Sequence, residues 1–252
     1  MSKSVFHNNL LTPSDLPGIL RYVRLFRRQT FFIGIDEVLI QTDSFSSILK
    51  EIEVLDSLNI RICLFFYKSD KSEFFLIKPD CSYDFATLQE SFDVYDFRLR
   101  ESELEGSTSS TNLAEKIQQA FDKQSVCVIR PKDMPINFKT HSLFKLLCLS
   151  TQIHKLIFLS NNECPVINDE PLTNISAHEL KKNLLKSSAN QLPDWFLNYS
   201  HLAIEAINDK IERVHLLNCN IHNALLNELF DKVGIGTMIH SNKYEIIREA
   251  NL

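Results

Sequence analysis

The chain has 252 residues, a net charge of −5 at pH 7 and 23% charged residues, which is typical of a folded globular protein. Hydrophobic residues make up 44% of it, enough to bury a substantial core in one large domain or two small ones. This balance argues against a nucleic-acid partner, because nucleic-acid-binding surfaces carry a basic excess. The basic run RYVRLFRRQ at 21–29 is interpreted as the solvated face of a helix.

The cysteine pattern indicates a reducing compartment. None of the six cysteines forms a C-x-x-C motif, and Cys63, Cys127 and Cys148 lie in apolar runs, where a thiol behaves as a small hydrophobic side chain. Because we also find no signal peptide, we expect a cytoplasmic protein. No apolar run reaches the length of a membrane span, so no membrane partner is expected.

Strand and helix patterns alternate along the chain. Residues 1–29 are expected to form an N-terminal helical segment that Ser14 could cap, and residues 30–252 are expected to form one α/β domain. Ser44 and Ser176 are candidate helix caps, and the serine-rich stretch 101–112 is expected to be a loop. Predicted strands lie at 30–40, 59–67, 73–79, 125–130, 155–160, 213–218 and 237–240. Predicted helices lie at 14–28, 44–58, 112–123, 142–151, 176–185, 194–209 and 223–232.

Two stretches resemble a known family. SFSSILKEIEVLDSLNIRICLFF (44–66) resembles the region after the first strand of bacterial N-acetylglutamate synthase. RVHLLNCNIHNALLNELFDKVGIGTMI (213–239) resembles the end of the amino acid kinase domain that these synthases share with acetylglutamate kinases, where the pattern runs RVHLLDG, ALLLELF and GIGT. A third segment, 137–160, fits at consistent spacing, whereas about 68–124 stays unaligned. The resemblance implies an amino acid kinase-like open αβα sandwich with a mainly parallel sheet, and a link to arginine biosynthesis.

The family's phosphate-handling elements are altered in this chain. Phosphoryl transfer needs glycine-rich turns that let backbone N–H groups approach the phosphates, and lysines that offset their charge. By alignment, Gly34 takes the place of a lysine, and Asp36 and Glu37 take the place of a glycine pair. YKSDKSE (67–73) stands where the family has a second glycine-rich turn, and His141 stands where it has an aspartate. DWFLNY (194–199) stands where the family has a late turn that ends in lysine. The resemblance with these losses predicts a catalytically inactive, pseudokinase-like domain without a cofactor.

Acetyl transfer has no sequence support either. The Q/R-x-x-G-x-G/A loop that binds coenzyme A is not found, and the chain holds only five glycines. In the bacterial synthase a separate acetyltransferase domain follows the kinase-like domain, and this chain stops about where that domain would begin. We therefore expect the kinase-like domain alone, with a separately encoded acetyltransferase as a possible partner.

The resemblance also implies an effector site. In arginine-inhibited members, the effector contacts a histidine, a glutamate and a glycine that correspond to His215, Glu228 and Gly234, and an N-terminal helix folds over them. A carboxylate suits the fork of a guanidinium group, so arginine or a related amino acid is the expected ligand. Each residue also has an ordinary alternative: a satisfied core or edge histidine, a helix-surface acid and a helix C′ cap followed by Gly236 in a turn.

Several functions stay open at this point. His215, Cys219 and His222 are close in sequence, but no fourth ligand is evident, so no metal is expected. We favour a regulatory or interaction subunit that binds an amino-acid effector and forms a homo-oligomer. The alternatives are a divergent acetylglutamate kinase or N-acetylglutamate synthase component with residual activity, and a structural oligomerisation subunit without a ligand.

Overall fold

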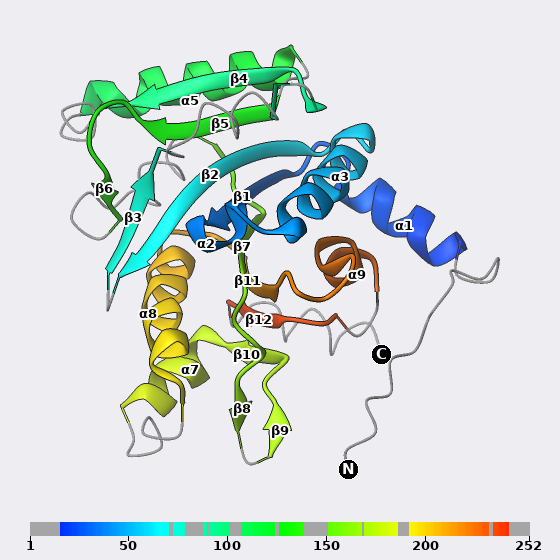
Figure 1. Cartoon of the computed structure of the whole chain (residues 1–252), viewed down its shortest axis with the longest axis vertical. Helices are drawn as coiled ribbons and strands as arrows, with labels where there is room; N and C mark the ends of the chain where they lie inside the picture. Colours follow the sequence, from blue (N-terminus) through cyan, green and yellow to red (C-terminus); the bar gives the residue numbers. More distant parts are fainter. Residues whose placement is uncertain are drawn as a thin grey trace.

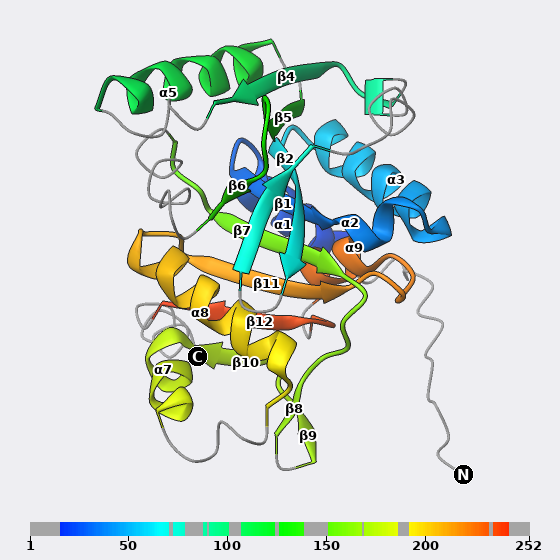
Figure 2. The same cartoon turned by 60° about the vertical axis from the view of Figure 1, so that its left-hand side comes forward.

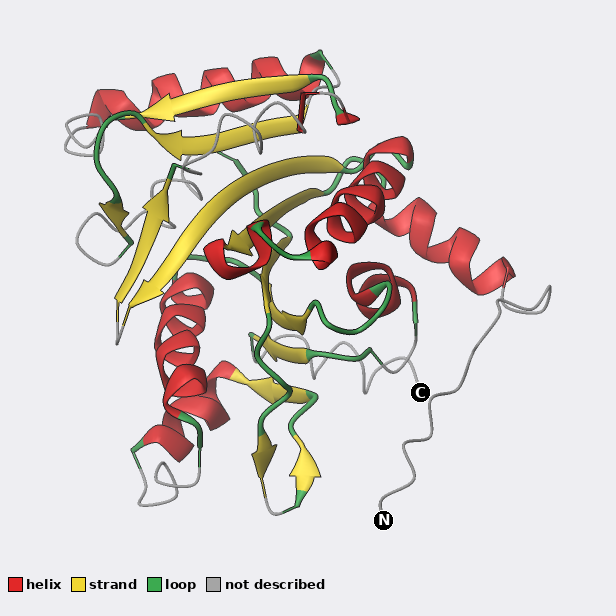
Figure 3. Cartoon of the chain, in the orientation of Figure 1, coloured by secondary structure: helices red, strands yellow, loops and turns green. Residues whose placement is uncertain are grey.

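A large mixed sheet with helices on both faces forms the body of the protein (Figures 1 and 3). The computed structural model describes residues 16–70, 73–78, 88–89, 91–100, 107–123, 126–138, 151–167, 169–185, 192–231 and 234–241. Ten strands of this part of the chain form the sheet, mostly in parallel pairs, and two more form a separate hairpin. This is the open αβα sandwich with a mainly parallel sheet that the sequence predicts.

The strand order in the sheet is β10-β12-β11-β7-β1-β2-β3-β6, with β5 joining β2 and β4 pairing with β5. The strands are β1 (Thr30–Asp36), β2 (Arg61–Asp70), β3 (Glu73–Ile77), β4 (Val94–Leu99), β5 (Val126–Pro131), β6 (Ile136–Asn137), β7 (Lys155–Ser160), β10 (Asn174–Ser176), β11 (Arg213–Asn218) and β12 (Thr237–His240). The hairpin consists of β8 (Val166–Ile167) and β9 (Glu170–Pro171).

One edge of strand β2 pairs with two different strands. Its residues Cys63 to Phe65 pair in parallel with β5, and its residues Phe66 to Asp70 pair antiparallel with β3. The other edge of β2 pairs with β1 over seven residues. The sheet therefore divides at β2, and the two branches diverge in Figure 1.

The helices form two layers, one on each face of the sheet. Figure 1 shows α1, α3 and α9 on one side of the sheet and α7 and α8 on the other, and Figure 2 shows α8 lying across β11 and β12. The helices are α1 (Leu16–Phe26), α2 (Glu37–Ile40), α3 (Asp43–Ser57), α5 (Ser107–Asp122), α7 (Ala177–Leu184), α8 (Asp194–Asn208) and α9 (Ala224–Phe230). None of the helices within the described ranges is both long and apolar enough to cross a membrane.

Alternation along the strands decides which layer each side chain meets. In β1, Phe31, Ile33 and Ile35 belong to a core cluster with α1, α2, α3 and α9, whereas Phe32 belongs to a second cluster with α5, α7 and α8. Successive side chains of a strand point to opposite faces, and strands buried on both faces read as continuous apolar runs. We call these faces the α9 face and the α8 face.

The structure agrees with most predicted elements and corrects several boundaries. The strands predicted at 155–160, 213–218 and 237–240 are observed with those limits, and Ser176 caps α7 by accepting a hydrogen bond from the Glu179 amide. The strand predicted at 30–40 ends at Asp36, because the Asp36 carboxylate accepts a hydrogen bond from the Val38 amide and starts α2.

Other corrections concern helix starts and missed strands. Ser44 is not a cap, since α3 begins at Asp43 after Thr42. The expected loop 101–112 is helical from Ser107 onward, and the strand predicted at 59–67 continues to Asp70. The sequence missed α2, β4, β6 and β8 to β10. The cap predicted at Ser14, the residue His141 and almost all of the helix predicted at 142–151 lie outside the described residues.

Candidate effector site

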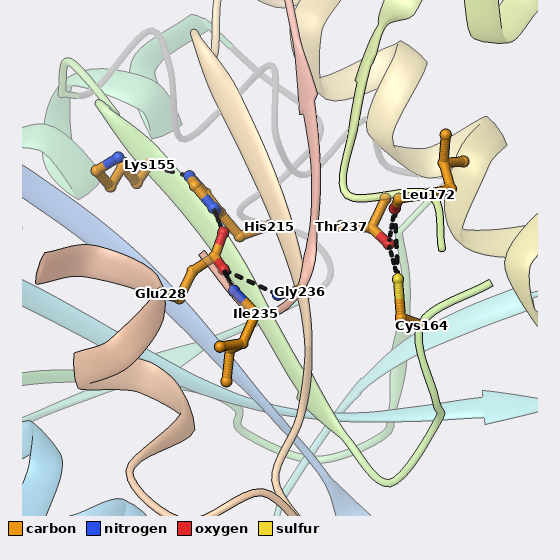
Figure 4. A network of polar contacts seen from close by, with 8 residues as sticks. All are labelled: Lys155, Cys164, Leu172, His215, Glu228, Ile235, Gly236 and Thr237. Atoms are coloured by element: carbon orange, nitrogen blue, oxygen red, sulfur yellow. Dashed lines mark hydrogen bonds and ion pairs between the residues drawn. The ribbon is translucent and has the colours of Figure 1, made fainter. Parts of the chain in front are cut away.

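His215 and Glu228 meet in the core of the α9 face. His215 comes from β11 and Glu228 from α9, and their side chains are only 3% and 4% exposed. His215 Nδ1 lies 2.7 Å from Glu228 Oε1, and Figure 4 shows the two side chains facing each other. On its other side, His215 Nε2 lies 3.5 Å from the Lys155 Nζ atom. Because an ionised carboxylate can only accept, the proton of the neutral imidazole lies on Nδ1 and is donated to Glu228.

The second oxygen of Glu228 binds the backbone of the turn before β12. Oε2 accepts hydrogen bonds from the amides of Ile235 at 2.8 Å and Gly236 at 2.9 Å (Figure 4). Gly234 adopts a φ of +67°, and a Cβ there would lie 2.9 Å from Glu228 Oε2. At Gly236, a Cβ would overlap the Leu217 side chain and the Leu216 carbonyl. The turn therefore requires glycine twice, first for the left-handed backbone and then for close approach.

Lys155 connects this cluster to helix α1. It begins β7 and is buried, and its Nζ atom lies 5.1 Å from the centre of the Phe26 ring and 5.8 Å from that of Phe31. Such ammonium–ring contacts are attractive, more so where water is excluded. Phe26, near the end of α1, also packs against Phe230 of α9 with ring centres 5.8 Å apart. The docking of α1 and the packing around His215 therefore share side chains.

Burial and neighbouring charges set the protonation states of the cluster. Burial, followed by the charge of Lys155, lowers the pKa of His215 to about 4. Burial, followed by the charge of Arg213, lowers the pKa of Lys155 to about 7. For Glu228, burial alone would raise the pKa, but hydrogen bonds from His215 and the two amides outweigh it and keep the pKa below its ordinary value. At pH 7 the site therefore contains a carboxylate and a neutral imidazole.

The structure brings the three predicted effector residues together. Glu228 is buried, so the alternative of a helix-surface acid is wrong. Gly234 is not a helix C′ cap, because α9 ends at Phe230 with Asp231 as its C-cap. Sequence reasoning missed Lys155, although a lysine that opens the apolar run KLIFLS was a signal for it. Among the described residues, no group of three or more His, Cys, Asp or Glu side chains is placed to hold a metal ion.

Aromatic side chains fill the α8 face at the carboxyl ends of β1, β2 and β7. Ligands of open α/β sheets usually bind beyond such strand ends. Here the hydroxyl of Tyr67 donates to the Leu159 carbonyl at 3.1 Å and lies 2.7 Å from the hydroxyl of Tyr199 in α8. The rings of Phe74 and Phe158 pack against this buried pair, with ring centres 4.8 Å (Phe74 to Tyr199) and 5.4 Å (Phe158 to Tyr67) apart.

The charged groups at these strand ends include two neighbouring acidic residues, Asp36 and Glu37, and one paired lysine. Burial, opposed by the hydrogen bond from the Val38 amide and aided by the charge of Glu37, raises the pKa of Asp36 to about 6. Lys68 is paired with Glu37 at 3.1 Å, so its charge is offset within the protein. A cavity at the ends of β7 and β11, lined by Ser160 and Asn218 among others, has a volume of about 30 Å³, room for one water molecule.

The residues that replace the family's glycine-rich turns adopt regular structure. A Cβ at Gly34 would lie 2.6 Å from the Phe65 ring, so the position aligned with the family's lysine has no room for a side chain. In the 67–73 stretch, residues up to Asp70 belong to β2 and Glu73 begins β3, and the stretch 194–199 forms the start of α8.

Sequence comparisons find two related enzymes. The chain is 31% identical over 94 residues to the acetylglutamate kinase of Kosmotoga olearia, a match that covers 36% of this chain and 31% of the kinase. It is 25% identical over 282 aligned residues to the amino-acid acetyltransferase of Pasteurella multocida, covering 92% of this chain and 64% of that protein. No protein-family model matches the chain. The chain thus spans less than two thirds of the length of the relatives it matches.

Solved structures show the same fold. N-acetylglutamate synthase from Neisseria gonorrhoeae, in complex with coenzyme A and N-acetylglutamate, superposes with a TM-score of 0.67 at 18% identity and covers 91% of this chain and 63% of its own. The complex of that synthase with coenzyme A and L-arginine gives 0.64 at 17% identity, covering 91% and 65%. UMP kinase from Ureaplasma parvum gives 0.52 at 11% identity, covering 85% and 100%. By fold and by sequence, the chain is an amino acid kinase-like domain related to acetylglutamate kinase and N-acetylglutamate synthase.

Proposed function

We propose that this domain is catalytically inactive and binds L-arginine or a related amino acid at His215, Glu228 and Gly234. The observation that carries the proposal is the state of Glu228, a buried carboxylate held ionised by His215 and two backbone amides. A carboxylate has about four acceptor positions, of which three are used here, so a further N–H donor can still be accepted. A structurally similar synthase has been crystallised with L-arginine.

A guanidinium group fits this environment. It is charged at all relevant pH values, and one of its N–H groups can bind the acceptor position that remains on Glu228. Because Glu228 is only 4% exposed, the ligand enters by displacing part of the packing around it, and the low local dielectric then strengthens the new bond. The shared packing of Phe26, Phe230 and Lys155 supports a role in which arginine changes how α1 docks.

The α8 face supports the loss of catalysis. Phosphoryl transfer depends on positioned positive charge and open backbone turns, whereas this chain has the Tyr67 and Tyr199 side chains at the strand ends. ATP turnover in the presence of N-acetylglutamate would contradict the proposal.

The proposed role is that of a regulatory or interaction subunit. On α1, Leu20 and Leu25 are 51% and 55% exposed, which supports contact with further copies of the chain or with a separately encoded acetyltransferase.

Binding of L-arginine tests the proposed site. We expect millimolar L-arginine to raise the melting temperature of the wild-type chain and to give a measurable heat on titration, because a ligand of the native state stabilises it by about 1.4 kcal/mol at ten times its Kd. Glu228→Gln should lose at least tenfold in affinity. Glu53→Gln, an exposed glutamate on α3, is the matched control and should bind as the wild type does.

Two results would count against the site. If millimolar L-arginine does not stabilise the wild type, L-arginine is excluded as a ligand. If the wild type and Glu228→Gln bind it with equal affinity, it binds at a site other than Glu228. Each variant is compared with its own melting temperature without ligand, since Glu228→Gln places an amide N–H₂ group near two backbone donors and is destabilised in any case.

A further inference from the structure

A second cavity lies where α3 ends, β2 begins and α5 ends. Its volume is about 310 Å³, which is ten times the share of one water molecule and is at the lower limit for small-molecule pockets. Ile60, Ile62 and Phe121 are buried and form its apolar part. The polar side chains that line it come from the end of α3 and the start of β2, namely Asp56, Ser57, Asn59 and Arg61.

Asp56 presents an unsatisfied carboxylate to this cavity. Within the described part of the chain, its side chain accepts no hydrogen bond and forms no ion pair, although its backbone carbonyl is bonded to the Asn59 amide. The side chain is half-buried, and burial raises its pKa. A carboxylate that loses water without gaining a partner is destabilising, and a cationic group would offset that cost.

Arg61 presents the opposite charge to the same cavity. Its guanidinium carbon lies 5.4 Å from the centre of the Phe121 ring. The N–H groups of arginine lie in the guanidinium plane, so a contact through the flat face leaves these donors free to bind elsewhere. Among the described residues, none accepts a hydrogen bond from this side chain, and no ion pair joins Arg61 to Asp56.

We infer that this cavity binds a small zwitterion, a free α-amino acid, with its ammonium group at Asp56 and its carboxylate at Arg61. Asp56 and Arg61 line one cavity with opposite charges that do not pair with each other. A ligand that carries an ammonium group and a carboxylate at different atoms can pair with both. Charge-assisted hydrogen bonds at both ends would fix the orientation of the ligand. The apolar part of the cavity is then left for the ligand's side chain. This site is separate from the His215 cluster, and the inference holds whether or not that cluster binds arginine.

The test uses thermal shift and calorimetry on the full chain with the common L-amino acids other than arginine. Each is added at about 10 mM, so that a ligand with a millimolar Kd is still detected. At least one should raise the melting temperature. Its N-acetyl derivative, which lacks the ammonium charge, and its amide, which lacks the carboxylate, should each bind at least tenfold more weakly. Failure of every amino acid, or equal binding of the neutralised derivatives, would overturn the inference.

Variants locate the site and separate it from the effector cluster. Asp56→Asn keeps the size of the side chain and removes an unpaired charge, so it should fold normally and bind at least tenfold more weakly, as should Arg61→Gln. Glu53→Gln, on the same helix, is the matched control, and Glu228→Gln should keep wild-type affinity for the amino acid identified. Wild-type affinity in Asp56→Asn would overturn the assignment, whereas a loss only in Glu228→Gln would assign the amino acid to the effector cluster instead.

Discussion

Asp36 and Glu228 show how partners, rather than burial alone, set the charge of an acidic residue. Asp36 is buried at the end of β1 and the Glu228 side chain on α9 is 4% exposed, and burial favours the protonated form of each. Glu228 accepts hydrogen bonds from an imidazole and two amides and stays ionised. Asp36 accepts one amide hydrogen bond and lies beside Glu37, so its pKa rises to about 6. Of the two, Glu228 is therefore the residue that keeps its negative charge more readily.

Replacing Asp36 should change how stability depends on pH. The unfolded chain releases this proton near pH 4, whereas the folded chain holds it to about pH 6. Between these values the folded state binds more protons, so its contribution to stability falls as pH rises, by about 3 kcal/mol in total. Asp36→Asn keeps an acceptor for the Val38 amide, so it should be more stable than the wild type at pH 7 and similar at pH 4. Urea unfolding at pH 4, 5, 6 and 7 measures this, and parallel profiles for the two proteins would contradict it.

At the scale of elements, α9 depends on a cap from another helix. Its N-cap residue Asn223 is left-handed and makes no side-chain hydrogen bond to the helix. The carboxylate of Glu51, in α3, takes that role by accepting hydrogen bonds from the amides of Leu225 at 2.8 Å and Leu226 at 3.1 Å. Because α9 carries Glu228, α3 helps to position the His215–Glu228 pair.

Loss of this cap should destabilise the protein measurably. Glu51→Gln exchanges the charged acceptor for a neutral amide, and we expect the free energy of unfolding to fall by about 1–2 kcal/mol at pH 7.5. Urea unfolding measures the loss, and faster hydrogen exchange at the Leu225 and Leu226 amides would locate it. Glu53→Gln, exposed on the same helix, should stay within about 0.5 kcal/mol of the wild type. Equal stability of the two variants would refute the role of Glu51.

The limits of the strands and helices show where local sequence patterns predict an element correctly and where they do not. KLIFLS and RVHLLN predict β7 and β11 correctly, because both are mainly apolar between clear polar ends, and only His215 interrupts the apolar residues of RVHLLN. The run at 30–40 was predicted too long, since its apolar pattern continues into α2 and only the cap formed by Asp36 separates the two. Ser107–Asp122 was predicted too short, because the serines and threonines at its start usually favour loops.

At the scale of the whole molecule, the sheet separates the His215–Glu228 pair from the aromatic cluster around Tyr67 and Tyr199. His215 and Lys155 point to the α9 face, and Tyr67 and Tyr199 meet on the α8 face. The family resemblance points to His215, Glu228 and Gly234, and all three lie within one contiguous segment of the sequence. Lys155 is sixty residues from His215, and the pair meets only through the parallel register of β7 and β11. The contact between Gly34 and Phe65 depends on strand pairing in the same way.

Hydrogen–deuterium exchange with L-arginine or with MgATP would test this separation most directly. We predict that L-arginine slows exchange in peptides covering 213–240 and helix α1, because a ligand at Glu228 restricts the turn and the packing around Phe26. MgATP should leave peptides covering 34–37, 67–70 and 194–199 unchanged. Protection of those strand-end peptides by MgATP, or no effect of L-arginine on 213–240, would contradict the account.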